Sequence, residues 1–294
     1  MVISPSPRWP VVALVGSSVM WGGMWWPLKQ INALGIGGIP LVICAFGAAS
    51  LLLLPILALQ RRSWTGDGRF LLLIALLGGY ANIAYTEALI YGEVVRVMVL
   101  FYLVPVWGVL GGRLFLGERI DWIRGLGVVL ALSGAFIILG GFKVLAGRIA
   151  WTDLLAVTCG MAFAGNNLVF RARQASPVSS KVAAMVLGSA LLALPLAFLA
   201  PWPQVAPASW GWVAAYGIGW MLAATAATQW AVTHMEAGRA STLIILELVT
   251  AVVSATLIGG ERMGPGEWFG SVLVIAAALL EAWRDEPQPA TSTV

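Results

Sequence analysis

Charged side chains are scarce in this chain. Asp, Glu, Lys and Arg together make up 10% of its 294 residues, whereas hydrophobic residues make up 60%. A soluble domain typically contains about 25% charged residues, which cover its surface. The mean hydropathy of +0.90 therefore excludes an ordinary soluble protein and indicates that lipid surrounds most of the side chains.

Residues that perform chemistry are also scarce. The chain has two cysteines and one histidine. Cys44 and Cys159 lie inside apolar segments, which is typical of small buried hydrophobes rather than of a disulfide or a metal pair. We find no Walker-type phosphate loop and no hydrolase or metalloprotease motif. We therefore expect no enzyme activity, no cofactor, no metal and no direct use of ATP.

Long apolar segments are what the sequence does have. A helix that spans a bilayer needs about 20 mostly apolar residues, and we count about ten such segments. They cover residues 9–27, 36–59, 69–90, 93–115, 122–142, 151–172, 179–200, 210–235, 238–258 and 265–283. Five fall in each half, and an odd number of spans per half places the second half upside down. The sequence thus predicts an all-α integral membrane protein with ten transmembrane helices, arranged as two inverted five-helix repeats.

The 17 basic residues are distributed unevenly between the loops of the two faces. Most of them fall on the loops that share a face with the N-terminus, which predicts that both termini are cytoplasmic. Because the basic residues occur singly or in small groups, the formal charge of +4 does not indicate nucleic-acid binding. We expect a multi-pass protein of a bacterial inner membrane, with a polar tail over residues 285–294 that is disordered.

The two halves match in sequence when the chain is shifted by 143 residues. Glu93 then aligns with Glu236, Arg96 with Arg239, and Gly117-Glu118-Arg119 with Gly260-Glu261-Arg262. Small residues also align, because Gly108 and Gly112 match Ala251 and Ala255. Such pairs let helices approach closely in lipid and are candidates for packing at gates, although they also arise by chance in spans rich in Gly and Ala.

Four motifs carry a resemblance to a known family: Glu87-Ala88-Leu89, Leu103-Val104-Pro105, Gly117-Glu118-Arg119 and Gly125-x-Gly127. This stretch resembles the EamA repeat of the drug/metabolite transporter superfamily. The second copy keeps Gly260-Glu261-Arg262 and Gly270 but has Leu248 in place of Pro105. The resemblance implies one repeat over residues 1–147 and an inverted one over 148–284. The chain looks closest to bacterial aromatic amino-acid exporters of the YddG type, which also pass the dication paraquat.

Aromatic and polar residues inside the spans are candidates for a substrate site. Trp21 and Trp25 are four residues apart and are expected to share a helix face, where indoles could stack on aromatic rings or attract flat cations. Polar residues are costly in lipid unless they face protein or water, and about half of them could serve helix–helix hydrogen bonds instead. The polar candidates for substrate binding are Asn82, Tyr85, Tyr102, Asn166, Gln229 and Glu247.

Glu247 is the most informative of these candidates. It lies near the centre of the ninth span and has no basic residue within one helical turn. Desolvation disfavours a carboxylate there unless it is paired. Glu247 could bind a substrate ammonium, carry a coupling proton or remain a neutral structural acid.

The leading interpretation is a secondary transporter that moves aromatic or neutral amino acids, exports them from the cytoplasm, and works by alternating access around a central cavity. Its partners are the small-molecule substrate and the lipid bilayer, and we favour a monomer. The first alternative is an exporter of flat or quaternary cationic drugs. A lower alternative is a membrane scaffold without transport.

Overall fold

The computed structural model describes residues 8–283 apart from 93, 146–147 and 261–263. The predicted tail and the repeat-matched Glu93, Glu261 and Arg262 lie outside the described residues. Within the described part of the chain, all regular structure is helical. Eight helical stretches there are long and apolar enough to cross a membrane, and Trp122–Ile138 is a shorter apolar helix.

Each predicted span of the first half coincides with one helix or with two consecutive helices. The elements are α1 (Arg8–Gly22), α2 (Trp25–Ala33), α3 (Gly38–Leu59), α4 (Arg61–Trp64), the 3-10 turn η1 (Thr65–Asp67), α5 (Gly68–Tyr91), α6 (Val94–Phe101), α7 (Val104–Leu116), α8 (Trp122–Ile138) and α9 (Phe142–Leu145).

The second half follows the same plan. Its elements are α10 (Trp151–Ala172), α11 (Val178–Ala193), the 3-10 segment η2 (Leu194–Phe198), α12 (Pro207–Ala215), the π-helical segment η3 (Tyr216–Met221), α13 (Leu222–His234), α14 (Ala237–Ile244), α15 (Leu246–Leu257) and α16 (Pro265–Trp283). The predicted eighth span is formed by α12, η3 and α13, which follow one another without a break.

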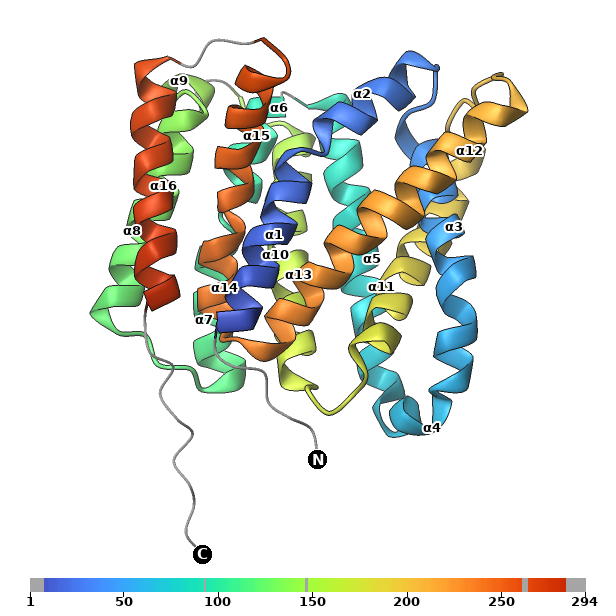
Figure 1. The fold of residues 1–294 in the computed structure, drawn as a ribbon, viewed down its shortest axis with the longest axis horizontal. Helices are drawn as coiled ribbons and strands as arrows, with labels where there is room; N and C mark the ends of the chain where they lie inside the picture. Colours follow the sequence, from blue (N-terminus) through green and yellow to red (C-terminus); the bar gives the residue numbers. More distant parts are fainter. Residues whose placement is uncertain (1–7, 93, 146–147, 261–263, 284–294) are drawn as a thin grey trace, which may run out of the picture.

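The two halves are inverted relative to each other (Figure 1). α1 begins at the lower end of the bundle in this view, and α16 ends there. We call this end, where Arg8 and Trp283 lie, the terminal face. α10 begins at the opposite face, where the Trp151 ring lies 5.8 Å from the Tyr91 ring at the end of α5. The predicted fold, with an even number of crossings, is therefore confirmed.

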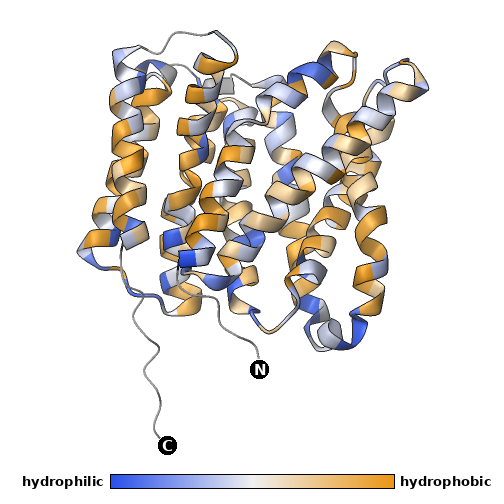
Figure 2. Ribbon diagram, viewed as in Figure 1, coloured by the Kyte–Doolittle hydropathy of each residue, from blue (hydrophilic) through white to orange (hydrophobic). Residues whose placement is uncertain are grey.

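Hydropathy explains why the bundle needs a membrane. Apolar residues cover the outward sides of the long helices, and polar residues collect at the two ends (Figure 2). Outward side chains such as Leu51 on α3 and Leu114 on α7 are more than two-thirds exposed. In water this surface would be far too apolar, whereas in a bilayer it faces lipid.

The first helix of each half packs into the other half. α1 lies against α13 and α15, and α10 lies against α5 and α7. The remaining spans pair across the repeat, α3 with α11 and α8 with α16. This exchange brings residues of both halves around one central space.

Three of the predicted spans are interrupted near mid-bundle. The first breaks at Gly23 and Met24, the fourth at Tyr102 and Leu103, and the ninth at Ile245. Pro105 accounts for the break between α6 and α7, because it has no N–H to donate to the carbonyl of Phe101. Interrupted helices of this kind are where secondary transporters place their binding sites.

Candidate functional site

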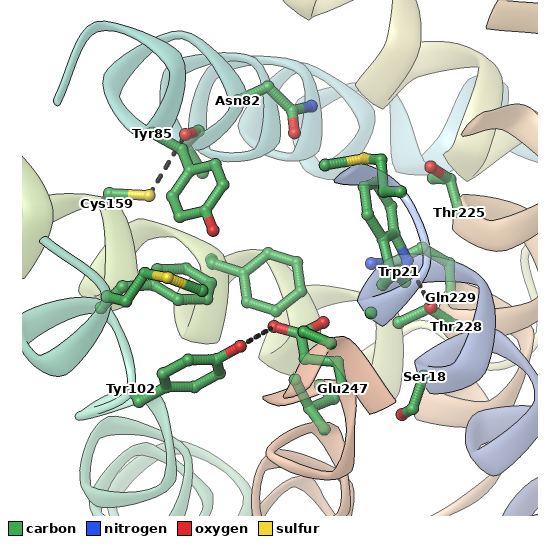
Figure 3. Close-up of a pocket in the computed structure, with 18 of the residues that line it drawn as sticks. Ser18, Trp21, Asn82, Tyr85, Tyr102, Cys159, Thr225, Thr228, Gln229 and Glu247 are labelled. Atoms are coloured by element: carbon green, nitrogen blue, oxygen red, sulfur yellow. Dashed lines mark hydrogen bonds between the residues drawn. The ribbon is translucent and has the colours of Figure 1, made fainter. Parts of the chain in front are cut away.

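A central cavity lies where the interrupted helices meet, and its empty space together with its opening to solvent measures about 860 Å³. Most of the predicted site residues line this cavity, namely Trp21, Asn82, Tyr85, Tyr102, Gln229 and Glu247. They come from α1, α5, the α6–α7 break, α13 and α15, and thus from both halves of the chain (Figure 3).

Glu247 and Tyr102 face each other from opposite repeats. The Tyr102 hydroxyl donates a 2.9 Å hydrogen bond to Oε1 of Glu247. Tyr102 lies in the break before α7, and Glu247 lies in the first turn of α15. The partial positive charge at the start of α15 favours a carboxylate at this position. As predicted, Glu247 has no basic residue within one turn of its own helix. Its hydrogen-bond partner is instead Tyr102 of the other half.

Close packing of α1 against α15 fixes the position of Glu247. Gly22 has no side chain, and an added Cβ would lie 2.6 Å from Cβ of Thr250 and 2.8 Å from the backbone nitrogen of Ala251. Only a glycine lets the helices approach so closely. Glu247 is therefore held at the crossing point of the two helices, with its carboxyl group directed into the cavity (Figure 3).

Aromatic rings surround this carboxyl group. Phe101 lies at the centre, with its ring centroid 4.9 Å from that of Tyr85, 5.5 Å from that of Tyr102 and 6.0 Å from that of Phe163. Aromatic faces attract cations and also stack with flat ligands. Among the described residues that line the cavity, none is Lys, Arg or His.

Amide and hydroxyl groups line the other side of the cavity. Gln229 donates from Nε2 to Oδ1 of Asn167 at 3.2 Å, and the Trp21 indole donates to Oγ1 of Thr228 at 3.2 Å. Asn82 on α5 donates to Oγ of Ser189 at 2.8 Å. The cavity thus has an acidic aromatic side and a neutral polar side.

Two predicted site residues do not line the cavity. Asn166 is fully buried behind Gln229, and its Nδ2 lies 3.5 Å from Oε1 of Gln229. Trp25 bonds Oγ of Ser254 at 2.8 Å, whereas Trp21 lies in the cavity. The expected shared face of the two indoles is not formed, because α1 ends at Gly22 and α2 begins at Trp25.

Between the cavity and the terminal face, α7 and α14 pack closely against each other. Gly108 lies against Ser241, and an added Cβ on Gly108 would collide with Oγ of that serine. Near the end of α7, Gly112 lies against Glu118 and Ala237. The matching small residues of the second half have different contacts. Ala251 on α15 faces Gly22 on α1. α15 also packs on α6 far less than α14 packs on α7.

An ionic cluster at the terminal face joins the two halves, and the sequence did not reveal it. Arg124 is fully buried and bonds Glu236, and its Nη1 lies 3.5 Å from Oε2 of Glu118. Glu118 in turn accepts the first N–H groups of α14, from Ala237 at 2.8 Å and Gly238 at 3.4 Å. The Gly-Glu-Arg motif of one repeat therefore caps a helix of the other repeat.

The backbone at Gly117 places Glu118 in this cluster. Gly117 ends α7 in the left-handed region with φ of 68°, and Gly260 in the matching motif has φ of 71°. A glycine adopts this conformation without strain, which gives the repeated motif its physical reason. Burial raises the pKa of Glu118, while the N–H groups of α14 and the Arg124 guanidinium favour its charged form.

Interrupted helices from inverted halves that enclose a central cavity define a membrane protein built as secondary transporters are. The chain belongs to the EamA-like transporter family, whose model matches residues 8–140 and 150–282. It is therefore a multi-pass membrane protein of a transporter family, with a small molecule as its substrate class.

The other comparisons bear on the fold. No curated protein matches the chain. One solved structure, described only as the crystal structure of a protein, is similar with a TM-score of 0.76 and 18% identity, over 94% of this chain and 98% of that one. At this identity the likeness shows the fold alone.

Proposed function

We propose that this chain is a secondary transporter of small aromatic molecules that carry a cationic nitrogen. The observation that supports this most is the single carboxyl group of Glu247, set among aromatic rings in a cavity without a basic residue among the described residues that line it. A substrate ammonium would lie between this carboxyl group and the ring faces, and the aromatic part of the substrate would stack on Phe101 or Tyr85.

The charge balance of the cavity ranks aromatic amines and organic cations first. A cation would complete a pair with Glu247, which offsets the cost of burying either charge alone. The carboxylate of an amino acid would find no guanidinium or ammonium group among the described lining residues. This ranking places the predicted alternative substrate class ahead of the predicted leading one.

Aromatic amino acids are the second candidate, and the neutral polar side of the cavity favours them. Asn82, Gln229, Thr225 and Thr228 line the same cavity as Glu247. A zwitterion could direct its ammonium group to Glu247 and its carboxylate to these amides and hydroxyls. The resemblance to aromatic amino-acid exporters supports the same candidate.

Three indole compounds that differ only in their charged groups separate the two candidates. We expect proteoliposomes to transport tryptamine at least about tenfold more efficiently than tryptophan, because an incompletely paired buried carboxylate costs about 1–3 kcal/mol. Indole-3-propionate, which has the acid and no amine, should not be transported. Counterflow of each radiolabelled compound is measured, with protein-free vesicles as the control for leakage.

Each other outcome of this comparison has a definite meaning. Transport of tryptophan equal to that of tryptamine would favour the amino-acid candidate. Transport of none of the three compounds would contradict the proposal and favour a membrane scaffold.

We propose alternating access as the mechanism. In this mechanism the close contact of α7 with α14 separates the cavity from the terminal face. On the other side, an adjoining cavity lined by α2, α3 and α5 leads toward the opposite face. With both termini in the cytoplasm, as the basic residues predict, this arrangement faces outward and releases an exported substrate. The other state would require α7 and α14 to separate and α6 and α15 to approach.

A bulky side chain at Gly108 tests the role of this contact. In Gly108→Leu, we expect transport to fall to below about a tenth of the parent rate, because the side chain must displace Ser241 of α14. Initial transport rates are compared at equal amounts of inserted protein. Gly16→Leu on α1 is the matched control, since an added Cβ there meets nothing within 4 Å. Full activity of Gly108→Leu would remove the α7–α14 contact from the mechanism.

A further inference from the structure

A second cavity of about 710 Å³ adjoins the central one. The two share the residues Trp21, Met24, Asn82 and Tyr85. From this shared boundary the second cavity extends between α3, α5, the α1–α2 break and η3, toward the ends of these helices at the opposite face. Of the described side chains, only those of these four shared residues lie on the boundary between a ligand at Glu247 and the second cavity.

The walls of the second cavity are apolar. They include Leu41, Val42, Ala45, Phe46, Leu89 and Met221, and none of its described lining residues is charged. Two of its polar side chains already bond within the protein, since Asn82 donates to Ser189 at 2.8 Å and Thr86 donates to the carbonyl of Asn82 at 2.9 Å. Ordered water needs several polar partners, so walls of this kind suit an apolar occupant better than water.

We propose that the second cavity binds the apolar tail of the substrate whose cationic nitrogen lies at Glu247. This inference rests on the proposed function and specifies its substrate class as amphiphilic cations, with an amine or quaternary head and an alkyl or aryl tail. The head lies among Tyr85, Phe101 and Tyr102, and the tail passes Trp21 and Met24 into the second cavity. The proposed occupant is part of the same molecule because the two cavities adjoin at Trp21, Met24, Asn82 and Tyr85.

The physical difference between the cavities explains why the tail takes this direction. The neutral polar side of the first cavity holds Gln229, Thr225 and Thr228, and a methylene chain there would leave these groups without water. In the second cavity the chain instead contacts aliphatic and aromatic carbon. Each methylene group that moves from water into such surroundings strengthens binding about fourfold.

A chain-length series tests the proposal. Benzyltrimethylammonium and benzyldimethylalkylammonium ions with two to eight carbons in the alkyl chain compete with radiolabelled tryptamine in proteoliposomes. We expect the inhibition constant to fall up to about fourfold per added methylene and to level off once the second cavity is filled. Free ligand concentrations are corrected for partitioning, which is measured with protein-free vesicles.

Val42 on α3 lines the second cavity and not the first. Variants of Val42 therefore test whether the dependence on chain length arises in the second cavity. In Val42→Phe, the inhibition constant should no longer fall as the alkyl chain lengthens. In Val42→Ala, it should level off only at longer chains. Leu51→Phe, also on α3 but 72% exposed on its outward side, should keep the parent series. If Val42→Phe fails to insert, the shift in Val42→Ala remains as the test.

The outcomes distinguish this inference from the function on which it rests. If benzyltrimethylammonium competes but the inhibition constant does not change with chain length, binding of the tail in the second cavity is rejected and the proposed transport of cations stands. Inhibition constants that depend on chain length identically in the parent and in Val42→Ala also reject binding of the tail in the second cavity. If neither tryptamine nor benzyltrimethylammonium is recognised, the proposed function fails and this inference fails with it.

Discussion

Replacing Glu247 with Gln is expected to weaken tryptamine binding by at least about thirtyfold. The substitution keeps the size of the side chain and an acceptor for the Tyr102 hydroxyl, but it removes the charge that pairs with the substrate. Loss of one partner from a buried, hydrogen-bonded charge pair costs about 2–5 kcal/mol. The dissociation constant is measured on purified protein with radiolabelled tryptamine, and transport is measured in parallel.

The control replaces a different glutamate with glutamine, outside both cavities. Glu87→Gln alters an acid on α5 that lines neither cavity, and it should bind tryptamine as the parent does. Tyr102→Phe should show a smaller loss than Glu247→Gln, because it removes one hydrogen bond and leaves the carboxyl group. Unchanged binding in Glu247→Gln would exclude this residue as the cation site.

Removal of the buried Arg124 is expected to open the terminal face. In Arg124→Gln, the carboxyl groups of Glu118 and Glu236 lose the guanidinium that holds them together, and breaking such a buried pair costs about 3–5 kcal/mol. The lost bond to Glu236 joins the first turn of α8 to the residue before α14, so its loss favours the state in which α7 and α14 are apart. Glu118→Gln should act in the same direction with a smaller effect.

Cysteine labelling reports this opening. Ser241→Cys is introduced into a chain with Cys44 and Cys159 replaced, because Ser241 is buried against Gly108. A membrane-impermeant maleimide should label this cysteine at least about tenfold faster in Arg124→Gln, a conservative bound given the size of the lost interaction. Arg113→Gln, an exposed arginine on α7, is the matched control. Equal labelling rates in the parent and Arg124→Gln would show that the cluster does not hold this face closed.

The helical spans could be predicted because their signal is local and strong. Runs such as Gly38–Leu59 are apolar over their whole length, and the repeated Gly-Glu-Arg motif relates the two halves. The interruptions are harder to predict. Pro105 marks one of them, and Gly22-Gly23 lies at another, but the break at Ile245 has neither proline nor glycine beside it.

The site was predictable to the extent that it depends on residue type. A carboxyl group, tyrosines and amides are costly in lipid, so their presence in spans already indicates an interior position. Their partners come from the other half of the chain, which no local pattern reveals. Glu247 meets Tyr102, and Arg124 meets Glu236, across more than a hundred residues of sequence. Asn166 lies behind Gln229 of its own half, and Trp25 is turned away from the cavity by the break between α1 and α2, so residue type alone did not place these two side chains.

The two long interrupted helices differ in one chemical detail. Pro105 at the start of α7 has no N–H, so the helical hydrogen bond from this position to the carbonyl of Phe101 cannot form. Leu248 occupies the matching place in α15 and keeps its N–H, which now donates to the carbonyl of Ile245 at 2.9 Å. That N–H could instead reach the carbonyl of Ile244 and straighten the joint between α14 and α15. The bend at Pro105 lacks the N–H that a continuous helix would use there, whereas the bend at Ile245 retains one, so the two halves need not move in the same way even though they share a common plan.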